Sequence, residues 1–273
     1  MPDMTVRVGR HAVSAATDRV DVGLAQQSAA LARGHENRVL ASLPAPELAL
    51  LARHLHVVSL PSGIVLQHHD HPPEYVYFPH DGLVSLLAMS QGGRTIEAAT
   101  AGRGGAVCPL LPGDQCDGFL TAVSHRSIRA SRIAAGRLDA ILSDSEALRR
   151  ALAACRQALM LQLRQNLVCC GLHSVEHRLP RWLLETADRV ECETISCTQE
   201  QVAQRLGVRR TTVTLLASKL QSMDAIRWGR SRVEILDRPR LEAMACSCYA
   251  SLREGISTLF PPGPHLPTKA LGS

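Results

Sequence analysis

The most constraining feature of this sequence is the stretch Thr198–Leu220, which reads TQEQVAQRLGVRRTTVTLLASKL. Thr198 and Gln201 have the spacing of a capping box, which marks the start of a helix. Apolar residues then recur at helical spacing until Gly207, and glycine accepts the left-handed backbone on which many helices end. A second amphipathic segment follows, whose apolar face begins at Val213. The stretch therefore predicts two short helices joined by a tight turn.

The second predicted helix begins with a basic, hydroxyl-rich tip that the apolar pattern leaves exposed. Arginine can bond one guanine edge through two parallel hydrogen bonds, and threonine can bond phosphate or touch a thymine methyl. We expect Arg210 to read a base and Arg209 and Thr212 to contact phosphates. A helix-turn-helix of this shape fits a major groove. The alternative is a helical hairpin whose arginines are only solvated.

A predicted β-hairpin follows the second helix directly. Residues 225–236 read as two short strands around a Gly229-Arg-Ser turn, which is the pattern of a wing. Cations also outnumber anions between residues 196 and 240, as expected for a nucleic-acid contact surface. The predicted DNA contacts of helices and wing together are Thr198, Gln199, Arg209, Arg210, Thr211, Thr212, Thr214, Lys219, Arg227, Arg230 and Arg232.

Composition limits the cellular setting and the kinds of site. The chain has 273 residues and nine cysteines, and it shows neither a secretory signal nor an apolar run near the ~20 residues that cross a bilayer. We therefore expect a cytoplasmic protein with reduced thiols and no membrane association. No CxxC pair is present, so a structural zinc ribbon is not predicted. A thiol sensor at Cys169-Cys170 or Cys246-x-Cys248 is an alternative to buried, inert thiols.

The N-terminal half predicts a rolled β domain. Residues 1–34 lack a sustained period and read as a flexible arm, and residues 35–143 hold short β-type runs separated by turn residues, which indicates a barrel or rolled sandwich. Helical segments flank this domain at residues 37–55 and 135–142. The predicted strands are 57–60, 64–67, 75–78, 83–89, 95–100 and 121–133.

A long helix is predicted over residues 144–171, with an apolar seam at three- and four-residue steps. A narrow seam on a helix of this length usually meets a partner helix, so we expect a two-fold dimer, with packing against its own domain as the alternative. The expected seam is Leu148, Leu152, Cys155, Leu159, Leu163 and Asn166. Residues 172–254 then form the winged helix-turn-helix domain, and residues 255–273, rich in proline, predict a disordered tail.

This order of parts resembles the Crp/Fnr superfamily, over about residues 36–250. The residues that carry the resemblance are 77–79 (YFP), 82–85 (GLVS), 174–179 (SVEHRL), 182–183 (WL) and 206–213 (LGVRRTTV). It implies an α+β fold with a cyclic-nucleotide-binding-like β-roll (double-stranded β-helix-like), a dimerisation helix and a C-terminal winged helix-turn-helix. It also implies a bacterial, cytoplasmic transcription regulator that binds double-stranded promoter DNA as a homodimer. RNA polymerase and an unknown small signal are the further expected partners.

The sequence departs from that family at the ligand site. Cyclic-nucleotide-binding members use a Gly-Glu pair and an arginine followed by Ser or Thr, whereas here the corresponding loop 102–108 lacks the glutamate and Gly118-Phe119 replaces the arginine pair. We therefore expect no tight cyclic-nucleotide binding and no cofactor. Cys108 is the first cysteine, so the N-terminal iron–sulfur sensor of other members is not expected. Arg210 matches the family's base-reading arginine, but Thr211 and Leu215 replace its glutamate and second arginine, which predicts a different operator.

Histidines cluster in two turns of the predicted roll. Imidazoles at this density could bind zinc, iron or copper, and the candidate ligands are His68, His69, His71 and His80. The alternative is a solvated turn, and we predict no metal site there. Two other functions remain as alternatives: a metal- or thiol-responsive module acting through protein contacts, and a cupin-like metal enzyme. The histidines lack the His-x-His pattern with distant Glu and His, so an enzyme is not predicted.

Overall fold

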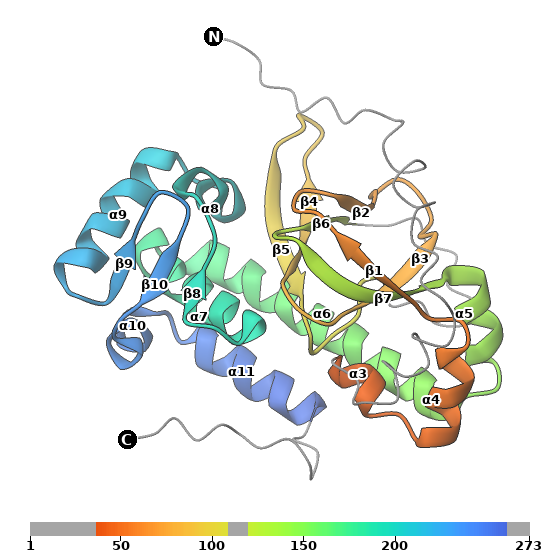
Figure 1. Cartoon of the computed structure of the whole chain (residues 1–273). Coiled ribbons are helices and arrows are strands. Elements are labelled where there is room, and N and C mark those ends of the chain that lie inside the picture. The colour runs from red at the N-terminus through yellow and green to blue at the C-terminus, as the bar shows by residue number, and fades with distance from the viewer. Residues whose placement is uncertain (1–36, 109–119, 261–273) are drawn as a thin grey trace.

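A computed structural model describes residues 37–108 and 120–260, which form an N-terminal β domain, a long helix and a C-terminal domain (Figure 1). The predicted arm at 1–34 lies outside these residues. The N-terminal elements are α3 (Arg38–Ala41), α4 (Ala45–Ala52), β1 (His56–Leu60), β2 (Val65–Gln67), β3 (Tyr75–Pro79), β4 (Val84–Met89), β5 (Thr95–Ala101), β6 (Thr121–Ser124), β7 (Ile128–Ala134) and α5 (Ala135–Leu142).

The β domain is a roll of two antiparallel sheets, in the orders β1-β7-β3 and β2-β6-β4-β5. Val84, Val107 and Ala130 lie in the apolar cluster of the roll, and all three are fully buried. The expected single strand over residues 121–133 is wrong, because it divides into β6 and β7. The chain changes sheets between them, since β6 pairs with β2 and β4 whereas β7 pairs with β1 and β3.

A buried asparagine anchors the start of α3 to the roll. The Asn37 side chain accepts hydrogen bonds from the backbone N–H groups of Val39 and Leu40, which caps α3. Its amide donates to the carbonyls of Pro79 and Gly105, at 2.9 Å each. Because every one of these groups is paired, Asn37 is fully buried at low cost.

The long helix α6 (Glu146–Leu172) begins at Ser145, whose hydroxyl accepts from the N–H of Leu148. It runs from beneath the roll into the C-terminal domain (Figure 1). Its first half packs with α3, α4 and α5 around Leu138 and Leu152. The helix is 27 residues long, as the pattern predicted, but it passes Gly171 and is capped at His173.

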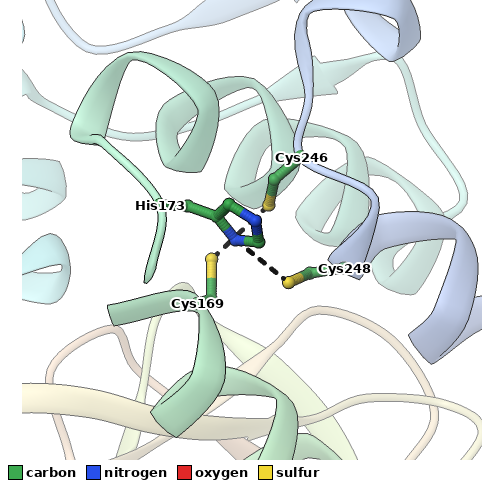
Figure 2. A group of neighbouring side chains, drawn as sticks. All are labelled: Cys169, His173, Cys246 and Cys248. Atoms are coloured by element: carbon green, nitrogen blue, oxygen red, sulfur yellow. Dashed lines mark hydrogen bonds between the residues drawn. The ribbon is translucent and has the colours of Figure 1, made fainter. Parts of the chain in front are cut away.

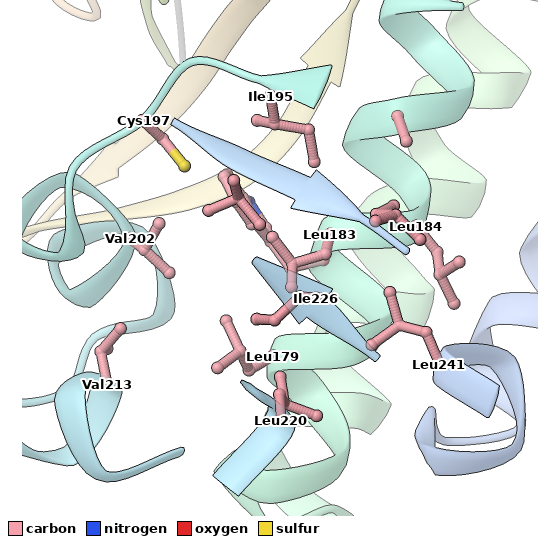
Figure 3. Close-up of a cluster of buried hydrophobic side chains, with 14 of the residues drawn as sticks. Leu179, Leu183, Leu184, Ile195, Cys197, Val202, Val213, Leu220, Ile226 and Leu241 are labelled. Atoms are coloured by element: carbon pink, nitrogen blue, oxygen red, sulfur yellow. The ribbon is translucent and has the colours of Figure 1, made fainter. Parts of the chain in front are cut away.

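The C-terminal domain is built around a small sheet in the order β8-β10-β9. Leu183 of its first helix and Val233 of its central strand are fully buried in one apolar cluster. Figure 3 shows part of this cluster around Leu183. The sequence pattern missed β8, which is only two residues long. The elements are α7 (Val175–Val190), β8 (Thr194–Ile195), α8 (Gln199–Leu206), α9 (Arg210–Ser222), β9 (Ile226–Trp228), β10 (Val233–Ile235), α10 (Arg238–Met244) and α11 (Cys248–Leu259).

Helix α11 runs past the predicted start of the C-terminal tail. Residue 255 was the predicted boundary, yet α11 continues to Leu259 and packs along α6. Gly255 explains the close packing, because a Cβ there would lie 2.4 Å from a methyl of Leu161. Phe260 then packs against the apolar cluster beneath the roll. The rest of the predicted tail, residues 261–273, lies outside the described residues.

Candidate nucleic-acid interface

Helix α8 and the turn after it are specified locally by capping. The Thr198 hydroxyl accepts from the N–H of Gln201 at 3.2 Å, and the Gln201 side chain accepts from the N–H of Thr198 at 2.9 Å, so the predicted capping box is present. Gly207 ends the helix at φ +68°. The N–H of Val208 then bonds the carbonyl of Ala203, which fixes the direction in which the chain leaves the turn.

Helix α9 presents the expected polar tip. Val213, Ala217 and Leu220 are buried in the domain core, which orients the opposite face outward. Arg209 is the N-cap and Arg210 the first helical residue, and both side chains are exposed. The positive end of the helix dipole is at this tip, and its first turn has no acidic residue. The tip therefore favours an anionic partner.

The outward face of α9 extends beyond the predicted DNA contacts. Leu215 is 72% exposed, and Ser218 is exposed one turn after Thr214. Both continue the line of Arg210 and Thr211, at the steps that share one helix face. An exposed leucine can touch a thymine methyl, and a serine can bond a base edge or a phosphate. Helical spacing alone places Leu215 on this face, although the sequence analysis considers it only as the residue that replaces the family's second arginine.

Gln199 and Thr214 connect the two helices. The Thr214 hydroxyl donates to the Gln199 side-chain oxygen at 2.6 Å, so these two predicted contacts are held at one edge of the surface. Thr212 is half-buried at the start of α9, beside the exposed Thr211. The two helices therefore offer a preformed polar surface.

Cations of the wing and of α9 extend this surface. Arg227 pairs with Glu234 at 2.9 Å, and Lys219 pairs with Glu176, both at exposed positions. Exposed pairs of this kind contribute about 0–1 kcal/mol, so phosphate can replace the carboxylate at little cost. Arg230 and Arg232 lie in the exposed turn between β9 and β10, which the N–H of Gly229 closes on the carbonyl of Arg232.

A buried ion pair joins this domain to the roll. Arg205 of α8 donates to the Glu97 carboxylate of β5 at 2.9 Å and to the Ser85 hydroxyl at 2.7 Å. Trp182 of α7 donates its indole N–H to the second Glu97 oxygen at 2.8 Å. The side chains of the pair are only 12% and 6% exposed. No local pattern in the sequence indicates this contact, because its partners are 108 residues apart.

Two more contacts reinforce the joint between the domains. The His125 Nε2 donates to the carbonyl of Ser196 at 3.0 Å. Burial, helped by the charge of Arg205, lowers the pKa of His125 to about 3, so its imidazole is neutral at ordinary pH. Gly207, at the end of α8, lies against Ile96 of β5. The roll therefore contacts α8, and the outward face of α9 stays exposed.

A polar network links α6 to both domains. Gln162 of α6 accepts from the N–H of Thr100 at 3.0 Å and from Arg189 of α7 at 2.9 Å. One turn later, Asn166 donates to the carbonyl of Ala98 at 2.7 Å and accepts from Arg181 at 2.6 Å. The same two turns of the long helix thus bond both β5 and α7.

The expected dimer seam is packed inside its own subunit, which is a correction. Leu148, Leu152 and Cys155 are buried under α3–α5, and Leu159 and Leu163 pack against the roll. Asn166 is engaged in the network above. These residues therefore pack against their own chain, which is the alternative given in the sequence analysis. The period was detected correctly, but a second face of α6 carries the exposed apolar side chains Met160, Leu167, Val168 and Leu172.

The candidate histidine ligands have separate partners. His69 Nδ1 bonds Thr121 at 3.2 Å, His71 pairs with Asp70 at 2.7 Å, and His80 Nε2 bonds Ser131 at 2.8 Å. The rings of His68 and His71 meet edge to face, with centroids 5.9 Å apart. None of the four belongs to a converging set of ligand atoms within residues 37–108 and 120–260.

The candidate thiols are arranged differently from either expected pair. Cys169 is buried 3.5 Å from Cys246, sulfur to sulfur, and Cys248 lies beside them. Cys170 is exposed and contacts Arg178 instead. Cys246 and Cys248 therefore share one cluster with Cys169 of α6.

The ligand loop of the roll is described in part. Residues 102–108 follow β5, and Val107 forms an antiparallel bridge with Tyr77. Burial raises the pKa of the Cys108 thiol to about 12. Gly118-Phe119, where the arginine pair was expected to be missing, lies outside the described residues.

Comparison with known proteins agrees with this arrangement. Residues 177–244 match the Crp-like helix-turn-helix domain. FixK2 from Bradyrhizobium japonicum superposes with a TM-score of 0.62 at 18% identity, over 70% of this chain and 98% of that chain. The c-di-GMP-responsive global regulator CLP of Xanthomonas campestris gives 0.60 at 16% identity, over 70% and 99%. A crp/fnr-family regulator from Eubacterium rectale gives 0.58 at 17% identity, over 77% and 98%.

No curated protein matches the sequence. Within the described residues, no helix has the length and apolar character needed to span a membrane. The chain therefore contains a Crp-like helix-turn-helix domain and has the fold of the Crp/Fnr-family regulators.

Proposed function

We propose that this protein is a sequence-specific, DNA-binding transcription regulator that acts as a homodimer. The observation that carries the proposal is the exposed face of α9, where Arg210, Thr214 and Ser218 line up on a helix backed by a buried core. The wing cations beside this face supply phosphate contacts, which give affinity without sequence preference. Base contacts from α9 then supply specificity.

The second face of α6 supports a homodimer. Met160 and Leu167 lie two turns apart and are 64% and 76% exposed, and Leu172 is 78% exposed. Large side chains this exposed on one helix are a typical association surface. A two-fold axis along this face would place two copies of α9 on two half-sites of a duplex.

The joint between the domains supports control by the roll. Glu97 belongs to β5, and its carboxylate holds Arg205 of α8 and Trp182 of α7 together. A signal that shifts β5 would therefore act on the orientation of α8, and α9 follows from α8 through the fixed turn. We propose that the signal is a small molecule other than a cyclic nucleotide, because the loop 102–108 lacks the family's glutamate.

Selection from a random duplex library with the full-length protein tests DNA recognition. The expected result is enrichment of a two-fold-related pair of half-sites, bound in excess competitor DNA with an affinity that falls steeply as salt rises. Arg150→Ala serves as control, since Arg150 is exposed on α6 far from α9. Failure to enrich any sequence would contradict the proposal, as would binding that is insensitive to salt.

Calorimetry with cyclic AMP and cyclic GMP tests the ligand proposal separately. We expect no binding at micromolar concentration, because a buried cyclic phosphate would lack its bidentate guanidinium partner. Micromolar affinity for either nucleotide would contradict this part and leave DNA recognition untouched.

A further inference from the structure

Four side chains with metal-binding atoms converge where the long helix ends. Cys169 and His173 are one turn apart at the end of α6, Cys246 lies between α10 and α11, and Cys248 is the first residue of α11 (Figure 2). Their three Sγ atoms and the imidazole nitrogen all lie within 4.8 Å of one another. No other set of three or more such residues converges in the part of the chain that the structure describes.

The distances fit a tetrahedral ion. Cys169 Sγ lies 3.5 Å from Cys246 Sγ, and Cys248 Sγ lies 3.3 Å from His173 Nδ1. Zinc bonds thiolate at about 2.3 Å and imidazole at about 2.0 Å, so in a tetrahedron two sulfur ligands lie roughly 3.8 Å apart and a sulfur and a nitrogen ligand roughly 3.5 Å apart. Both separations in the structure are within about 0.3 Å of these values. Small side-chain rotations would bring the remaining ligand atoms to similar separations.

The surroundings suit a bound cation with thiolate ligands. The three cysteines are 1%, 6% and 2% exposed, whereas His173 is half-buried and leaves a route for an ion to enter. The Arg181 guanidinium lies beside Cys169. Three thiolates with one Zn²⁺ carry a net single negative charge, which Arg181 is placed to balance. Binding would release the remaining thiol protons.

A simple disulfide accounts for less of this geometry. A bond between Cys169 and Cys246 would use two of the four groups and leave Cys248 and His173 pointing at the same place without a role. The neighbouring Cys170 shows the contrast, because it is exposed and contacts Arg178 outside the cluster. Convergence of three sulfurs and one imidazole nitrogen is the ligand set of a Cys₃His zinc site.

We propose that Cys169, His173, Cys246 and Cys248 form a zinc site that ties the end of α6 to the start of α11. The absence of a CxxC motif had argued against zinc, but here the ligands come from two segments brought together by folding. His173 is also the single-residue cap between α6 and the N-cap of α7. The ion would therefore fix the junction at which the long helix passes into the C-terminal domain.

Titration of the full-length, untagged, reduced protein with Co²⁺ tests the site. After chelation and removal of the chelator, we expect one Co²⁺ per chain, with the intense visible absorption of tetrahedral cobalt and a thiolate-to-cobalt charge-transfer band. Addition of Zn²⁺ should bleach both signals. This readout does not depend on DNA, so it stands or falls separately from the proposed function.

Variants locate the ligands. Cys246→Ser and Cys248→Ser should each lose the charge-transfer intensity of one thiolate and weaken Co²⁺ binding at least about tenfold, and His173→Ala should weaken it with all thiolates retained. The matched control, Cys170→Ser, should bind as the wild type does. Circular dichroism checks that each variant is folded.

Four results would overturn the zinc site. The reduced wild-type protein would bind neither Co²⁺ nor Zn²⁺; Cys170→Ser would lose binding as the ligand variants do; mass spectrometry would find a Cys169–Cys246 disulfide in protein prepared under reducing conditions; or the isolated protein would contain iron with inorganic sulfide.

Discussion

At the residue scale, two arginines of the proposed DNA surface have different expected roles. Arg210 leads the outward face of α9, whereas Arg230 lies in the wing turn, away from that face. Arg210→Ala should reduce discrimination at one base pair by ~1–3 kcal/mol. Arg230→Ala should weaken binding to all DNA sequences about equally. It should also reduce the slope of log affinity against log salt concentration by about one. Binding of each variant to a selected site and its single-base mutants decides between these roles; equal behaviour of the two would contradict them.

His125 gives the second prediction at this scale. Its folded pKa is about 3 against an ordinary 6.5, so the unfolded chain binds a proton more readily than the folded one. Stability is then complete above pH 6.5 and falls by about 1.4 kcal/mol per pH unit as pH decreases toward 3. Urea unfolding at several pH values should show a shallower slope for His125→Gln. His56→Gln, at an exposed position, is the control, and an unchanged slope in His125→Gln would contradict the assignment.

At the scale of elements, the joint between β5 and α8 should be costly to break. Glu97→Ala leaves the Arg205 charge buried with one partner fewer, which typically costs about 3–5 kcal/mol. Glu234→Ala breaks the exposed pair with Arg227 and should cost no more than about 1 kcal/mol. Urea unfolding compares the two variants. A small, equal loss in both would mean that the two domains are not held together by this pair.

The same scale shows why some elements were predictable and others were not. Helices α8 and α9 are set by local signals, since Thr198 caps one and Gly207 ends it, and the sequence predicted both. The division of residues 121–133 into two strands depends on a change of sheets, which no local period records. The inner face of α6 was detected as a period, but only the fold shows that Leu152 packs under the roll. Likewise, the four convergent ligands meet only after folding.

At the scale of the whole molecule, the proposal requires two chains joined through the exposed face of α6. Leu167→Glu places a charge at the 76% exposed centre of that face, so burial in a dimer would become unfavourable while the monomer fold is untouched. We expect sedimentation analysis to shift from dimer to monomer. Leu50→Glu, at a 41% exposed leucine of α4, is the matched control and should stay dimeric.

DNA binding then links this interface to function. One α9 contacts one half-site, so a monomeric Leu167→Glu variant should lose most of its affinity for a two-fold site and keep a weak, salt-sensitive binding to any duplex. For a duplex with a single half-site, the affinities of the wild type and the variant should differ much less. If Leu167→Glu stays dimeric, the outer face of α6 is not the interface. If it becomes monomeric yet binds the full site as the wild type does, pairing of the two copies of α9 is not what creates the specificity.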